Sequence, residues 1–193
     1  MSAATDRRTF LKLAAAAGTG FIATAHDAGA ETRMRKYRMI GKEVPEFEAS
    51  LAGGGRITNQ KFNGQWSFVE FWGLWCGPCL LDAPYVSAMV RTASEDPEVQ
   101  YISFHLFKNY GKWKSVEAYM EENEISYPVI LDPKASVMAK FKLQATPSYL
   151  IVGPDRIIRA CHTSFGDDQP GRDQFALWMK VFAFLRAGGK LKD

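Results

Sequence analysis

A chain of 193 residues with 47% hydrophobic and 13% aromatic side chains can bury one sizeable core, which excludes a disordered protein. Its formal net charge of +3 is too small to indicate a nucleic-acid partner. Three cysteines, two of them separated by only two residues, exclude a framework of structural disulfides. We therefore expect one globular domain whose chemistry centres on the close cysteine pair.

Residues 1–30 are typical of an export signal. Arg7 and Arg8 stand together before Phe-Leu-Lys, and an apolar stretch rich in Ala and Gly follows. This run resembles a bacterial twin-arginine signal, and small residues up to Ala25 and Ala30 suit cleavage. A retained anchor and a basic amphipathic terminus stay open as alternatives, although roughly 13 uninterrupted apolar residues fall short of the roughly 20 that span a membrane. We expect the functional domain at 31–193, in the periplasm, where disulfides persist.

Hydrophobic periodicity predicts strands alternating with helices after this signal. A polar and basic segment at 31–43 is expected to lie as an arm on the surface, and Asn63-Gly64 offers hairpin chemistry. The predicted elements are, in chain order, an extended segment at 44–49, strands at 56–58 and 66–72, a helix at 76–93, a strand at 99–107, a helix at 114–123, a strand at 127–131, a helix at 135–143, strands at 148–152 and 156–161, and a helix at 172–187. This order predicts an α/β fold with helices on both faces of a sheet.

Cys76 and Cys79 stand where the predicted strand at 66–72 gives way to a helix. Cysteines three positions apart at a helix start can close into a disulfide and reopen, because the free backbone N–H groups there favour the thiolate. The alternative, half of a structural zinc site, requires a second pair of ligands. No such pair exists among the remaining candidates, which are Cys161, His26, His105 and His162. A redox dithiol without a metal is the favoured interpretation.

Residues 71–79 read Phe-Trp-Gly-Leu-Trp-Cys-Gly-Pro-Cys, and Thr146-Pro147 precedes a later strand. With Asp82 and Pro84 following the cysteines, these motifs resemble the thioredoxin superfamily, and within it the exported proteins of the TlpA and ResA type. The resemblance covers nearly all of residues 42–187. It implies a thioredoxin-like fold with a central mixed sheet, helices on both faces, extra N-terminal strands and a central helical insert.

The resemblance also implies roles for individual residues. Cys76 is expected to be the exposed attacking thiol, and Cys79 the more buried thiol that resolves the mixed disulfide. Trp75, Thr146 and a cis Pro147 are expected to bind substrate, although a Thr-Pro pair alone is also an ordinary turn. Glu70 stands where thioredoxin carries a buried aspartate. It is interpreted as a general base for Cys79, the alternative being a carboxylate with a structural partner only.

We therefore predict a periplasmic thiol–disulfide oxidoreductase that reduces protein disulfides and needs no cofactor. Substrates implied by the resemblance are apocytochrome c or copper-site oxidase subunits, and a membrane thiol-transfer protein would re-reduce the dithiol. The alternatives on the same fold are a thiol peroxidase, which normally needs Thr where Gly73 stands, and a copper-delivery protein using His105 or His162. Cys161 is interpreted as a small buried hydrophobe. The basic and aromatic run at 108–114 is either a solvated connection or a partner contact.

Overall fold

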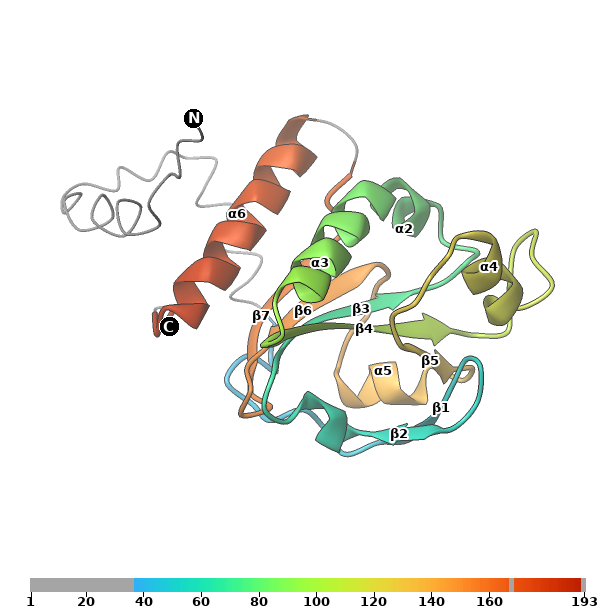
Figure 1. Cartoon of the computed structure of the whole chain (residues 1–193), viewed down its shortest axis with the longest axis horizontal. Coiled ribbons are helices and arrows are strands. Elements are labelled where there is room, and N and C mark those ends of the chain that lie inside the picture. The colour runs from blue at the N-terminus through green and yellow to red at the C-terminus, as the bar shows by residue number, and fades with distance from the viewer. Residues whose placement is uncertain (1–36, 167–168, 192–193) are drawn as a thin grey trace, which may run out of the picture.

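One mixed sheet of seven strands, in the order β2-β1-β5-β4-β3-β6-β7, forms the centre of the fold (Figure 1). The computed structural model describes residues 37–166 and 169–191, so the expected signal at 1–30 lies outside the described residues. Strand β4 pairs in parallel with β3 and β5, and the other pairs are antiparallel. The strands are β1 (Glu48–Leu51), β2 (Arg56–Thr58), β3 (Trp66–Trp72), β4 (Val99–Leu106), β5 (Val129–Asp132), β6 (Ser148–Val152) and β7 (Ile158–Thr163).

Helices cover both faces of this sheet, as predicted. Helices α3 and α6 lie side by side over one face, α5 covers the other, and α4 lies at the end of the sheet where β4 stops (Figure 1). None of the described helices is both long and apolar enough to cross a membrane. The helices are η1 (Asn59–Phe62), α2 (Gly77–Leu81), α3 (Ala83–Glu95), α4 (Val116–Glu122), α5 (Ser136–Lys140) and α6 (Gln169–Arg186).

Strand β3 is buried along almost its whole length because helices cover both of its faces. Phe68 packs against Phe182 of α6, with ring centroids 4.4 Å apart. Phe71 points to the opposite face, where it stacks on Phe104 of β4 at 4.4 Å. Since side chains alternate between the faces of a strand, β3 anchors both cores and fixes the point at which the chain leaves the sheet.

Two segments near the start of the described chain differ from the prediction. Asn63-Gly64 does not close a hairpin, because β2 pairs only with β1 and η1 carries the chain on to β3. The part of the basic segment that the structure describes is not a surface arm. Met39 is buried in the core, and the Gly41 amide donates to the Ile158 carbonyl at 2.8 Å. The apolar Met39 side chain explains this packing.

The helix predicted at 76–93 is divided into α2 and α3 at Asp82. Pro84 has no amide hydrogen for the carbonyl of Leu80, and its ring would clash with that carbonyl in a continuous helix. Asp82 therefore ends α2 and begins α3. The cysteine pair stands on a helix of only five residues, Gly77–Leu81.

Candidate active site

Cys76 is the residue at which β3's connection becomes helix α2. Its backbone is extended, and the Cys79 amide donates to the Cys76 Sγ at 3.3 Å. Pro78 lies in the first turn, where its missing N–H leaves no hydrogen bond unmade. Because α2 has only five residues, its dipole is small, and this direct amide contact is the interaction that would favour negative charge on Cys76 once the disulfide is reduced.

Cys76 and Cys79 are joined by a disulfide, with Cα atoms 5.3 Å apart. The prediction that Cys76 is exposed is wrong for this oxidised form, in which Cys76 is 4% and Cys79 5% exposed. The sulfur of Cys76 turns back toward the helix to meet its partner, and the exposed side chains around the pair are apolar instead. Trp75 is 40% and Leu80 43% exposed.

Glu70 lies in the middle of β3, between Ser103 of β4 and Tyr149 of β6. Its side chain is buried and accepts a hydrogen bond from the Tyr101 hydroxyl at 2.7 Å. Burial raises the pKa of the Glu70 carboxyl to about 8; the nearby Asp82 adds to the rise, and the Tyr101 hydrogen bond opposes it. At neutral pH this carboxyl is mostly protonated.

A small cavity of about 30 Å³ connects Glu70 with the redox pair. Glu70 and Cys79 both line it, together with Trp72, Leu80, Ala83, Val86, Tyr119 and Tyr127. A volume of roughly 15 Å³ is enough for one water molecule. The cavity that Glu70 and Cys79 both line therefore has room for a water molecule.

The Thr146–Pro147 peptide bond is cis, as the resemblance implied. Ser148 pairs with Phe71 near the end of β3, so the preceding Pro147 lies at the same end of the sheet as the cysteine loop. Pro147 is buried and Thr146 is half-buried. The structure thus brings the second predicted motif to the edge of the sheet from which Cys76 emerges.

Trp75 lies beside Thr146 along a groove of about 280 Å³. The Trp75 indole Nε1 donates to the Leu106 carbonyl at 3.3 Å, and its ring lies 5.9 Å from that of Phe107. Phe107 is itself 44% exposed. The end of β4 therefore holds Trp75 in place next to the disulfide.

His105, which the sequence offered as a possible copper ligand, instead supports the loop before Cys76. Its Nε2 accepts the Leu74 amide at 3.2 Å, so the ring hydrogen lies on Nδ1. Burial lowers the pKa of His105 to about 4, while the charge of Glu117 acts in the opposite direction. The imidazole is neutral at physiological pH and positions the two residues before Cys76. His105 lies opposite Trp72 in the parallel register of β3 and β4, a pairing that the sequence alone does not give.

Asp82 is a buried carboxylate to which sequence reasoning gave no role. Its oxygens accept the Tyr149 hydroxyl at 3.2 Å and the backbone amides of Phe165 at 3.0 Å and Gly166 at 2.9 Å. The Ser164 hydroxyl adds a fourth hydrogen bond at 3.3 Å. Asp82 therefore ties the break between α2 and α3 to the segment that follows β7.

Cys161 and His162 lie on β7, where His162 is opposite Tyr149 of β6. Cys161 is a free, buried thiol whose pKa burial raises to about 12, in agreement with a small core residue. His162 stacks on Phe165 with ring centroids 4.5 Å apart. Within residues 37–166 and 169–191, no three His, Cys, Asp or Glu side chains are grouped so that they could hold a metal ion.

Known proteins resemble this chain in sequence and in fold. The thiol-disulfide oxidoreductase ResA of Bacillus subtilis is 26% identical over 117 residues, which cover 60% of this chain and 62% of ResA. A Sinorhizobium meliloti structure, the hypothetical protein SMc02350, aligns with a TM-score of 0.66 and 16% identity over 79% of this chain and 87% of its own. A Chlorobium tepidum structure, a candidate thiol:disulfide interchange protein DsbE, aligns with a TM-score of 0.61 and 19% identity. The alignment covers 75% of this chain and 96% of the Chlorobium chain.

At these identities the two structures support the thioredoxin-like fold alone, and the sequence match to ResA spans less than two thirds of that relative. The family model described as AhpC/TSA matches residues 40–161, which include the cysteine pair and the cis-proline. Since this match covers more than half of the sequence, the chain belongs to the AhpC/TSA family.

Proposed function

We propose that the protein is an exported thiol–disulfide oxidoreductase that reduces disulfides in other proteins. The observation that carries this proposal is the Cys76–Cys79 disulfide at a strand–helix junction, with the Cys79 amide on the Cys76 sulfur. An amide that donates to this sulfur favours its thiolate form once the disulfide is reduced. The name of the Bacillus subtilis relative supports the same reaction.

The reaction proceeds in two exchanges. The Cys76 thiolate attacks one sulfur of a substrate disulfide, forming a mixed disulfide and releasing the other substrate sulfur as a thiol. The Cys79 thiolate then attacks Cys76 Sγ, which frees the second substrate sulfur and leaves the Cys76–Cys79 disulfide. Two electrons pass from the protein dithiol to the substrate disulfide.

Glu70 is the proposed general base for the second exchange, acting through the minor fraction of its carboxyl that is ionised at neutral pH. Its pKa of about 8 lies close to that of an ordinary thiol, roughly 8.5, so a proton moves between Cys79 and Glu70 at little cost in free energy. The small cavity that both side chains line supports transfer through a water molecule.

Substrate binding is assigned to Trp75, Thr146 and Pro147. Pro147 has no amide hydrogen, and the adjoining backbone of Thr146 is proposed to pair with an extended substrate segment, as strands do in β-addition. The groove shared by Trp75 and Thr146 offers space for a neighbouring side chain of that segment.

The cellular setting is proposed from the sequence. The twin-arginine-like segment at 1–30 directs the protein to the periplasm, with apocytochrome c or copper-site oxidase subunits as substrates. A membrane thiol-transfer protein re-reduces the pair there. The Gly77-Pro78 spacer favours a reducing couple, nearer to the roughly −270 mV of thioredoxin than to the roughly −120 mV of DsbA.

The two alternative functions meet specific obstacles. A β-carbon at position 73 would lie 2.4 Å from the Trp75 Nε1, so the threonine that peroxidases carry there does not fit while Trp75 keeps its place. For copper delivery, the His105 Nε2 is occupied by the Leu74 amide. Peroxide consumption at thiol-peroxidase rates, or tight copper binding lost in His162→Ala, would favour these alternatives over our proposal.

Trapping tests the proposed function directly. Cys79→Ala, expressed in the export compartment, is expected to hold substrate proteins as mixed disulfides through Cys76, which gel shifts under non-reducing conditions and mass spectrometry would identify. Cys76→Ser/Cys79→Ala is the matched control and should trap none. Equal trapping by both variants, or full disulfide-reductase activity in Cys76→Ser, would overturn the proposal.

A further inference from the structure

The groove beside the disulfide is apolar along its floor. Its lining includes the apolar side chains of Trp75, Phe107, Met138 and Leu143, and also Thr146, which precedes the cis-proline. Phe107 is held with a φ of 59°, a conformation that is unfavourable for a bulky residue, and its ring is nevertheless exposed. The groove is therefore shaped to receive an apolar side chain of a bound segment.

Three lysines are chain neighbours of residues that line this groove, and we refer to them as its rim. Lys108 follows Phe107, Lys134 precedes Ala135, and Lys142 precedes Leu143; in each pair the second residue named lines the groove. All three lysines are exposed. Across the described part of the chain, none of them forms an ion pair with a carboxylate.

The segments that frame the groove contain no exposed carboxylate to offset these charges. Residues 73–81, 104–116 and 133–147 include no Asp or Glu. Asp132, just before the last of them, is buried and accepts the amides of α5's first turn, including Val137 at 3.0 Å. The net charge beside the disulfide is therefore positive.

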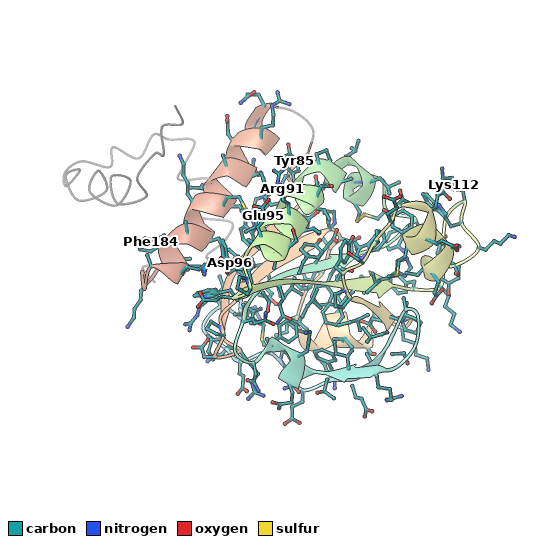
Figure 2. The ribbon with its side chains drawn as sticks, viewed as in Figure 1. Tyr85, Arg91, Glu95, Asp96, Lys112 and Phe184 are labelled. Atoms are coloured by element: carbon teal, nitrogen blue, oxygen red, sulfur yellow. A yellow bond between two sulfur atoms is a disulfide. The ribbon has the colours of Figure 1, made fainter. Side chains whose placement is uncertain are left out.

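The loop after β4 adds further positive charge and is fixed against the cysteine loop. Gly111 approaches so closely that a β-carbon there would lie 2.9 Å from the Leu74 carbonyl oxygen. Lys112 is exposed on this loop, at the end of the molecule where α4 lies (Figure 2). Of the acidic residues of α4, Glu122 accepts a hydrogen bond from the Trp113 indole at 2.9 Å, and Glu117 is near enough to His105 for its charge to act on that imidazole.

We propose that the groove and its rim, Lys108, Lys134 and Lys142, bind an extended segment of the substrate protein that carries acidic residues on both sides of its cysteine. This inference rests on the proposed function and adds the chemistry of the substrate. One apolar side chain of the segment enters the groove, and flanking carboxylates approach the lysines. Charge complementarity at such a surface raises association rates most strongly at low salt.

Three peptides test this selectivity. They share one length and one central cysteine, flanked on each side by two Glu, two Gln or two Lys residues, with the cysteine blocked as a neutral thiopyridyl disulfide. The reduced protein's Cys76 attacks the peptide sulfur and thiopyridine leaves with the bonding electron pair. Cys79 then displaces the peptide as a thiol, so the protein dithiol is oxidised by two electrons. Dividing each rate by that of dithiothreitol removes differences in intrinsic reactivity.

We expect the Glu peptide to react about tenfold faster than the Lys peptide at low ionic strength, with the ratio shrinking as salt is added. Lys108→Gln/Lys134→Gln/Lys142→Gln should abolish the preference, whereas the corresponding Lys→Arg variant should keep it. The matched control is Lys42→Gln/Lys61→Gln/Lys190→Gln, which removes the same charge from exposed positions outside the groove and should also keep it.

The other outcomes have definite meanings. Equal rates for all three peptides, with loss of reaction in Cys76→Ser, overturn the inference and leave the proposed function standing. A preference that survives the Lys→Gln change at the rim also overturns it. If phosphatidylglycerol vesicles bind through these lysines while the peptides show no preference, the surface recognises lipid instead. Failure of every peptide to react faster than with Cys76→Ser overturns the proposed function and this inference together.

Discussion

Glu70 places an acid where apolar packing would otherwise continue through the sheet. Its side chain accepts one hydrogen bond, from the Tyr101 hydroxyl. Among the described residues, no Lys or Arg forms an ion pair with it. The neutral form of the carboxyl is therefore the stable one in the folded protein. Such a residue has a measurable effect on stability as well as on the proposed reaction.

We predict that wild-type stability falls, relative to Glu70→Gln, as pH rises from 4.5 to about 8. In this window the folded carboxyl keeps a proton that the unfolded chain has released, so the folded state binds more protons and each increase in pH favours unfolding. The difference is complete above pH 8. Urea unfolding of both proteins across this range would measure it, and parallel stability curves would contradict the raised pKa.

His105 should give a dependence of the opposite sign. Its folded pKa of about 4 lies below its usual 6.5, so the unfolded chain binds more protons between these values. Stability is fully present above pH 6.5 and is lost as pH falls through 4. His105→Phe should remove this loss and, by leaving the buried Leu74 amide without its acceptor, cost roughly 1–3 kcal/mol at neutral pH. Chemical unfolding at pH 5 and pH 7.5 checks both effects; an unchanged free energy of unfolding at pH 7.5 would show that the hydrogen bond contributes little.

At the scale of elements, the end of β4 and the loop that follows it support the residues before Cys76. His105 accepts the Leu74 amide, Leu106 accepts the Trp75 indole, and Gly111 packs on the Leu74 carbonyl. The run at 108–114, for which the sequence left a solvated connection and a partner contact open, is thus also a structural support for the cysteine loop.

Gly111→Ala should destabilise the protein more than Gly41→Ala. Both glycines have positive φ, 59° and 76°, so both substitutions carry the same kind of backbone penalty, about 1–2 kcal/mol. Only at position 111 would the new methyl group also meet a backbone oxygen, since nothing lies within 4 Å of it at position 41. Thermal unfolding of the two variants isolates this contact, and equal losses would mean that the loop moves away without cost.

The sequence predicted a feature correctly where neighbouring residues in the chain determine it, and failed where distant residues meet only in the fold. The bounds of β3 were predicted correctly because a strand covered on both faces is apolar throughout, and the break at Asp82 follows from Pro84 in hindsight. The hydrogen bonds of Asp82 and His105 could not be predicted, because their partners lie 31 to 84 residues away and meet only in the folded chain. The burial of Cys76 likewise depends on how the closed disulfide turns the side chain.

At the scale of the whole molecule, Asp82 joins the cysteine helix to the last part of the chain. Asp82→Ala would leave the buried amide of Phe165 and its neighbour without an acceptor, so we expect a loss of at least about 3 kcal/mol in unfolding free energy. Asp82→Asn keeps one acceptor oxygen, so its unfolding free energy should lie between those of the wild type and Asp82→Ala. Equilibrium unfolding in urea measures this series, and a loss below about 1 kcal/mol for Asp82→Ala would show that water replaces the carboxylate.

The contact between Trp75 and Gly73 constrains how such a protein could change its chemistry. The indole fills the space that any side chain at position 73 would need, and it is tethered by its hydrogen bond to Leu106. A threonine introduced at 73 would have to displace the Trp75 indole and break its hydrogen bond to the Leu106 carbonyl. The surface proposed to bind substrate would then be lost before a peroxidase site is formed. Positions 73 and 75 therefore share one space, so a larger residue at 73 requires a change at 75 as well.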